Sequence, residues 1–68
     1  MDSNSAVIDE LGGTGVVAAL VGLKAPAVSN WRRDGIPPRH WHKLVGANPE
    51  TISFERLEKL NPAAHRAA

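Results

Sequence analysis

Glycine and proline divide this chain into short segments, and this punctuation limits what it can fold into more than any other feature. The breaks fall at Gly12-Gly13, Gly22, Gly35 with Pro37-Pro38, and Asn48-Pro49. Both residue types favour turns over the interior of a helix or strand. None of the five segments between the breaks alternates polar and apolar residues for long enough to indicate a strand. The pattern predicts an all-α fold, a compact bundle of about five short helices.

Apolar residues at helical spacing place these helices at about 4–11, 14–21, 25–34, 38–45 and 53–60. Thr14 is expected to cap the second helix and Ser53 the fifth, while Pro38 suits the first turn of the fourth. Helices this short are not stable alone in water, so packing must hold them together. The residues expected to face inward are Val7, Ile8, Leu11, Val17, Ala18, Val21, Val28, Trp31, Trp41, Leu44, Val45, Ile52, Leu57 and Leu60.

Size and composition indicate one small domain. The chain has 68 residues, of which 43% are hydrophobic, and no cysteine. Residues 1–62 are expected to form the domain and residues 63–68 a frayed tail. Without cysteine there is no disulfide or thiolate metal site, which fits a reducing compartment. No apolar run approaches the ~20 residues that span a bilayer, and the polar N-terminus does not resemble a signal peptide, so we expect a cytoplasmic protein without membrane contact.

Positive charge gathers in the middle of the chain. Between Lys24 and Lys43 there are five basic residues and one acidic residue, whereas the rest of the chain has three basic and six acidic residues. Such clustering is typical of a basic face that binds phosphates. A solvated surface with chance clustering gives the same pattern, and charge alone does not separate the two interpretations.

The segment 14–34 meets the requirements of a helix-turn-helix. Ala18 is small where a second helix must pass close, and Gly22 allows a turn with positive φ. Leu23 is expected to plug the corner between the helices. Val28 and Trp31 are then spaced to anchor the second helix in the core.

The stretch from Ala27 to Pro37, AVSNWRRDGIP, and the following helix at 39–45 resemble the small Cro/YdaS-like group of phage and prophage regulators, which includes the carph-isopro domains. The segment from Ile8 to Gly13 is similar to their first helix and turn. This resemblance implies the lambda-repressor-like fold and a DNA-binding regulator. The group usually has Ser or Thr capping its second helix, whereas this chain has Lys24, which costs the cap hydrogen bond, about 1 kcal/mol.

One face of the segment 25–34 is expected to read DNA bases. If Val28 and Trp31 turn inward, the opposite face carries Ala25, Pro26, Ser29, Asn30 and Arg33. The N-terminal half of such a helix enters the major groove. Asn30 can pair with adenine, Arg33 with guanine or a phosphate, and Ser29 with several bases. The resemblance places base-reading residues at the same positions.

Phosphate contacts are expected from residues around this face, namely Thr14, Lys24, Arg32, Arg39, His40 and Lys43. Trp31 and Trp41 are interpreted as core residues rather than as platforms for unpaired bases. His40 and His42 are two residues apart and diverge on a helix, so we expect no metal site and no cofactor. The sequence shows no nucleophile paired with a base, so we do not expect an enzyme.

These features predict a sequence-specific regulator of transcription, a Cro-like repressor that occludes a palindromic operator in double-stranded DNA as a homodimer. No small-molecule ligand is expected. The dimer contact is placed at the fifth helix and the tail, because Phe54 is left over once the core is filled. Two alternatives stay open: a protein-binding module, such as an antitoxin or an inhibitor of a host protein, and an architectural DNA binder without sequence preference.

Overall fold

The computed structural model describes residues 2–62, and within this range the chain forms five α-helices and one 3₁₀ turn with no strand. The elements are α1 (Asn4–Glu10), α2 (Thr14–Val21), α3 (Ala25–Asp34), η1 (Pro38–His40), α4 (Trp41–Ala47) and α5 (Phe54–Leu60). The predicted all-α class is confirmed. The predicted tail, residues 63–68, lies outside the described residues. None of the described helices is long and apolar enough to cross a membrane.

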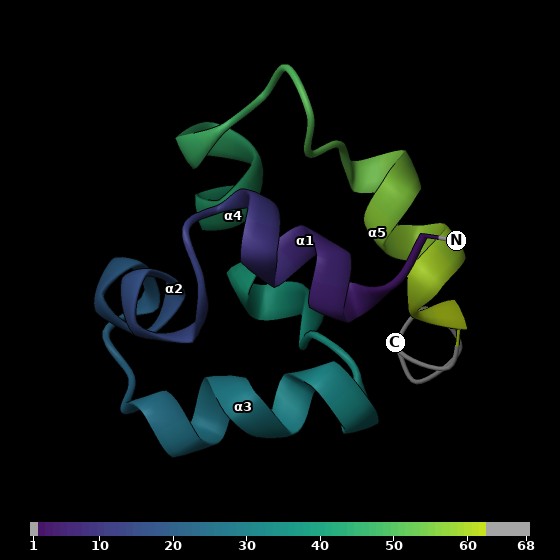
Figure 1. Ribbon diagram of the computed structural model, residues 1–68. Helices are drawn as coiled ribbons and strands as arrows, with labels where there is room; N and C mark the ends of the chain where they lie inside the picture. The colour runs from purple at the N-terminus through teal and green to yellow at the C-terminus, as the bar shows by residue number, and fades with distance from the viewer. Residues whose placement is uncertain (1, 63–68) are drawn as a thin grey trace.

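The helices surround a small core and leave one side of α3 open. In Figure 1, α3 runs along the lower edge of the domain, α2 is seen nearly along its axis, and α1 crosses the front. Helix α3 packs mainly on α2 and α1, while α4 packs on α2 and α5. Because its neighbours all lie on one side, α3 presents its other side to solvent along its whole length.

A single cluster of buried apolar residues holds the helices together. Its members are Val7, Ile8, Val17, Ala18, Val21, Val28, Trp31, Ile36, Trp41, Leu44, Ile52 and Leu57. Leu11, Val45 and Leu60 pack against this cluster and are half-buried. All the residues that helical spacing turned inward therefore lie in or against the core, whereas Leu23, expected to plug the turn after α2, does not. Ile36, from the loop after α3, joins them, and its carbonyl accepts a hydrogen bond of 2.8 Å from the Trp41 indole.

The ends of three helices show how the local sequence determines where a helix begins or ends. Ser53 caps α5 as predicted, since its hydroxyl accepts a 3.1 Å hydrogen bond from the backbone N–H of Arg56. Ser3 caps α1 in the same way. Gly22 ends α2 in the left-handed region, with φ of 74°, which an L-residue with a side chain adopts at a cost.

Three local expectations were wrong. Thr14 does not cap α2: Gly13 is the cap residue, and the Thr14 hydroxyl accepts hydrogen bonds from Arg32 instead. The fourth segment begins as the separate turn η1, and α4 then continues through Gly46 to Ala47.

Leu23 does not plug the corner between α2 and α3, because 39% of its surface is exposed. The buried residues on either side of the turn are Val21 and Val28, which already fill the core at this point.

Asn61, the residue after α5, is a buried polar residue. Its Oδ1 accepts hydrogen bonds from the Ile36 N–H and the Asn4 amide, and its Nδ2 donates to Asn4 Oδ1 and to the Leu57 carbonyl. These bonds satisfy the whole amide group, as burial requires. Gly35 fits beside it with φ of 105°, where an added Cβ would lie 2.8 Å from Asn61 Oδ1.

Arg56 joins the start of the chain, α1 and α5. Its guanidinium donates to both carboxylate oxygens of Asp2 and of Glu10 and to the Thr51 carbonyl, at 2.7–2.9 Å. These hydrogen bonds lower the pKa of the Asp2 carboxyl, and they lower the pKa of the Glu10 carboxyl. The cluster therefore favours the folded state only while both carboxyls are ionised.

We expect acid to weaken the fold partly through this cluster. Because the folded-state pKa values lie below the ordinary 3.8 and 4.5, the stabilisation is present above these values and is lost as the pH falls through the folded pKa values. The variant Arg56→Met should be less stable than the wild type at pH 7 and lose less stability on acidification. Chemical denaturation at pH 7 and at pH 3 measures this difference. The control Lys59→Met breaks only an exposed 3.5 Å pair with Glu55 and should follow the wild type.

Candidate nucleic-acid interface

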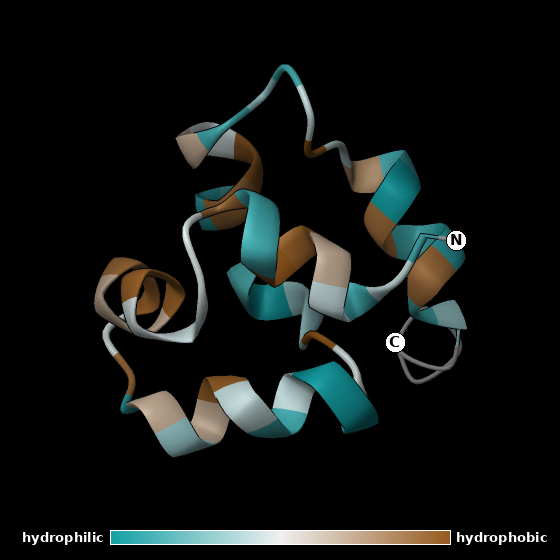
Figure 2. Cartoon of the chain, in the orientation of Figure 1, coloured by the Kyte–Doolittle hydropathy of each residue, from teal (hydrophilic) through white to brown (hydrophobic). Residues whose placement is uncertain are grey.

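Helix α3 has the orientation that its sequence predicts. Val28 is fully buried and Trp31 is 6% exposed, so both anchor the helix in the core. The inward direction of these two residues is confirmed. Figure 2 shows that α3 is much less hydrophobic along its length than α2, as expected for a helix with one open side.

All five residues of the predicted reading face are exposed, and they make up the outward side of α3. They are Ala25, Pro26, Ser29, Asn30 and Arg33. The side chain of Arg33 is 78% exposed and forms a 3.3 Å ion pair with the carboxylate of Asp34, which is 65% exposed. An exposed pair of this kind contributes little to stability, so Arg33 can exchange Asp34 for another acceptor at little cost.

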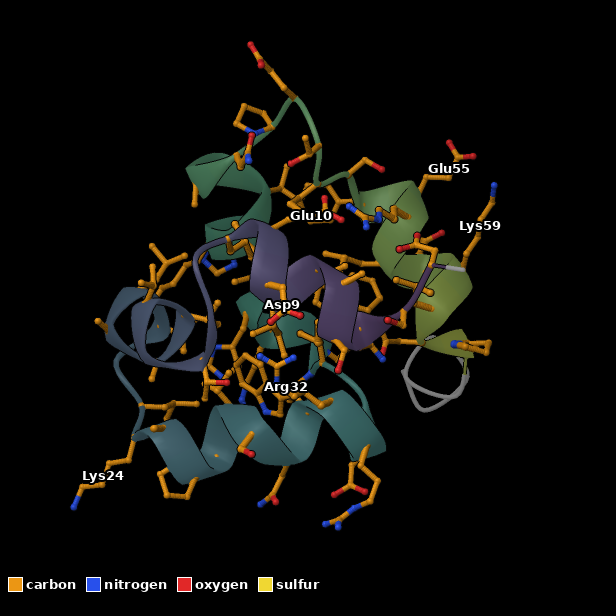
Figure 3. All side chains as sticks on the ribbon, in the orientation of Figure 1. Asp9, Glu10, Lys24, Arg32, Glu55 and Lys59 are labelled. Atoms are coloured by element: carbon orange, nitrogen blue, oxygen red, sulfur yellow. The ribbon has the colours of Figure 1, made fainter. Side chains whose placement is uncertain are left out.

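Lys24 stands at the start of this face. Its side chain points away from the domain in Figure 3, and the residue is exposed. It occupies the N-cap position of α3 without a side-chain cap hydrogen bond, as the sequence predicts. Pro26 follows in the first turn, where a missing N–H breaks no helical hydrogen bond.

The turn η1 contacts α3 through His40, and two exposed basic residues lie near His40 in the chain. The His40 ring stacks on the Trp31 ring, with 5.3 Å between ring centroids and 29° between planes, and this stacking joins η1 to α3. Arg39 and Lys43, on either side of His40 in the chain, are exposed. Partial burial lowers the pKa of the His40 imidazole, and the nearby charges of Arg39, Lys43 and His42 lower it further. The lowered pKa favours the uncharged form of His40, so Arg39 and Lys43 are the main source of positive charge in this segment.

Arg32 is placed differently from its prediction as a phosphate contact. Its guanidinium turns toward α1 and α2, donating to Thr14 Oγ1, to Ser5 and to Asp9. Figure 3 shows Arg32 and Asp9 pointing toward one another. The physical reason is helical spacing: Arg32 follows the buried Val28 by four residues and lies on the same side of the helix. The same spacing is the sequence signal by which this inward position could have been found.

Thr14 is half-buried beside Arg32, at the first position of α2. The structure thus leaves Lys24, Arg39 and Lys43 exposed, stacks His40 on Trp31, and places Thr14 and Arg32 against each other. Ser5 and Asp9, the α1 residues that hold Arg32, are not among the residues predicted from the sequence.

Comparisons of this chain with protein families, with curated proteins and with solved structures found no match.

Proposed function

We propose that this protein is a sequence-specific DNA-binding regulator in which α2, residues 22–24 and α3 form a helix-turn-helix of the lambda-repressor-like kind. The observation that carries the proposal is the two-sidedness of α3: Val28 and Trp31 are buried, while Ser29, Asn30 and Arg33 are exposed. A reading helix needs this division, because one side must hold the helix and the other must meet base edges.

The arrangement of α2 and α3 supports the proposal. Only Gly22, Leu23 and Lys24 separate the two helices, and the chain turns at the left-handed Gly22. Figure 1 shows α2 nearly end-on and α3 from the side, so their axes cross steeply. A steep crossing through a short glycine-containing turn is typical of this motif.

In the proposed interface, the exposed residues of α3 would read bases and the exposed basic residues would bind phosphates. The amide of Asn30 matches the paired donor and acceptor of adenine, and the Arg33 guanidinium matches the two acceptors of guanine. Ser29 adds a hydroxyl, and Ala25 and Pro26 offer apolar contact to a thymine methyl group. Lys24, Arg39 and Lys43 would hold the flanking phosphates, which fixes the register of α3 without reading sequence.

We further propose that two copies bind a palindromic operator, because one module of this size has little contact area for specificity. The 48% exposed Phe54 on α5 is the residue we assign to the dimer contact. Such a protein would repress transcription by occlusion, in the manner of Cro, with neither catalysis nor a cofactor or small-molecule ligand. The cytoplasm of a bacterial or phage-infected cell is the compartment that fits.

Selection of bound duplexes from a random pool tests the function directly. The expected result is one enriched site with two-fold symmetry, whose affinity falls steeply as salt rises because bound phosphates release counterions. Equal binding of scrambled duplexes would favour an architectural DNA binder. The absence of binding at low salt would refute the proposal.

A protein-binding module is the second candidate, and one observation favours it. Val16, Leu20 and Leu23 are 53%, 38% and 39% exposed along the outer side of α2 and the turn after it. Exposed apolar residues at this spacing are typical of a contact with another protein. Binding through them would change little with salt, whereas DNA binding would weaken, so a salt titration separates the two functions.

Replacing Asn30 with alanine is expected to reduce discrimination between the selected site and a site changed at the adenine it reads by about 1–3 kcal/mol. The fold should be unaffected, because Asn30 is exposed. Competition binding with the two duplexes measures the effect. The matched control is Thr51→Ala, also exposed but in the loop before α5. Unchanged discrimination in Asn30→Ala would show that α3 does not read DNA through this residue.

A further inference from the structure

The hydroxyl of Thr14 has an unusual set of partners for a helix-terminal threonine. Arg32 donates to its Oγ1 twice, from Nε at 3.4 Å and from Nη2 at 3.1 Å. A threonine hydroxyl has two acceptor lone pairs and one hydrogen that it can donate. With both lone pairs directed at the guanidinium, the hydrogen is left to point away from Arg32.

Arg32 is itself fixed in place. Its Nη1 donates to the Ser5 hydroxyl at 3.2 Å, and its Nη2 forms a 2.8 Å ion pair with Asp9. The Arg32 side chain is only 28% exposed, although the Asp9 side chain is 65% exposed. The guanidinium therefore connects α1, α2 and α3, and it can impose one orientation on the Thr14 hydroxyl.

We infer that Arg32 is a positioning residue that turns the Thr14 hydroxyl into a hydrogen-bond donor for a DNA phosphate. This inference rests on the proposed DNA-binding function. Phosphate oxygens only accept hydrogen bonds, so a hydroxyl whose hydrogen is already turned outward is the group they require. The first backbone N–H groups of α2 have no partner inside the helix, so they are further donors at the same end of α2.

This role differs from a direct phosphate contact by Arg32. A direct contact requires the guanidinium to leave Ser5, Asp9 and Thr14 and to reach the outside. A lysine could take over a direct contact, because it keeps the charge, but one ammonium cannot reproduce the forked donors that hold Oγ1. The two roles therefore predict opposite results for Arg32→Lys.

The test is a double-mutant cycle on DNA affinity with Thr14→Val and Arg32→Lys, measured at a temperature where circular dichroism shows every variant folded. Thr14→Val should weaken binding about 10-fold to 150-fold, as expected for the loss of one hydrogen bond to a charged acceptor. Arg32→Lys should weaken binding to a similar extent, and the double variant should bind no more weakly than either single variant. Thr14→Ser, which keeps the hydroxyl, should bind like the wild type.

Two controls separate the outcomes. Asp9→Asn removes the charge of the ion pair but keeps an oxygen that can accept from Arg32, and Ser5 and Thr14 still hold the guanidinium, so it should lower the melting temperature and leave DNA affinity nearly unchanged. Arg32→Met tests whether the charge of Arg32 contacts a phosphate directly. Because we infer no direct contact, the salt dependence of DNA binding by Arg32→Met should equal that of Thr14→Val.

Additive losses in the cycle, or wild-type affinity in Arg32→Lys, would overturn the inference. Affinity that stays unchanged in all variants while stability falls would also overturn it, because Arg32 would then be structural only. Either result leaves DNA binding by the wild type intact, whereas a wild-type protein that binds no duplex refutes the proposed function itself.

Discussion

Replacing Trp31 with alanine is expected to lower the free energy of unfolding by about 3–5 kcal/mol. The indole is 6% exposed in the core and also supports the His40 ring. Its removal loses the transfer free energy of a large apolar group and leaves a cavity that short helices fill only in part. A domain of this length has roughly 3–10 kcal/mol of stability in total, so the variant should be largely unfolded at 37 °C.

Chemical denaturation followed by far-ultraviolet circular dichroism measures this loss. The control is Ser29→Ala on the exposed side of the same helix, which should change stability by less than about 0.5 kcal/mol. Any DNA binding lost in Trp31→Ala should return at low temperature to the extent that the variant folds. A wild-type melting temperature in Trp31→Ala would mean that α3 does not face the core as described.

The second large effect is expected at Asn61. The variant Asn61→Ala removes the acceptor of the Ile36 N–H and both partners of the Asn4 amide. Buried groups left without partners cost about 1–3 kcal/mol each, and partial access of water to Asn4 reduces the sum, so we expect a loss of about 2–4 kcal/mol.

Two comparisons make the Asn61 prediction specific. Asn4→Ala should cost only about 1 kcal/mol, because it leaves the bond from Ile36 to Asn61 in place. Asn30→Ala, which removes an exposed amide, should leave stability nearly unchanged. Equal losses in Asn4→Ala and Asn61→Ala would mean that the bond to Ile36 contributes little.

Most local features of this fold, though not the cap of α2, could be predicted from the sequence, because they depend on neighbours within one helical turn. Helical spacing was enough to place Val28 and Trp31 on the inward side of α3 and to leave Asn30 on the outward side. A serine before an amphipathic segment was enough to predict the cap of α5. The exposure of Leu23 could not be predicted from the turn alone. An apolar residue at this position is generally expected to plug the corner, but here Val21 and Val28 already occupy the core beside the turn.

The long-range polar contacts could not be predicted in this way. Asn61 bonds to Asn4 across 57 positions of the chain, and Arg56 bonds to Asp2 across 54. Periodicity and capping rules describe only neighbours, so they assign such residues to a helix end or a solvated face. Arg32 is the intermediate case: its spacing from Val28 indicates the side of α3 on which it lies, but its partners are set by how α1 and α2 pack.

The bond between Ile36 and Asn61 makes one backbone hydrogen a reporter of tertiary structure. Most protected amides in a helical protein are held by their own helix, so their exchange with deuterated solvent reflects fraying as well as unfolding. The Ile36 N–H instead donates to a side chain that follows α5. Its deuterium uptake therefore measures how often the C-terminal helix separates from the loop behind α3.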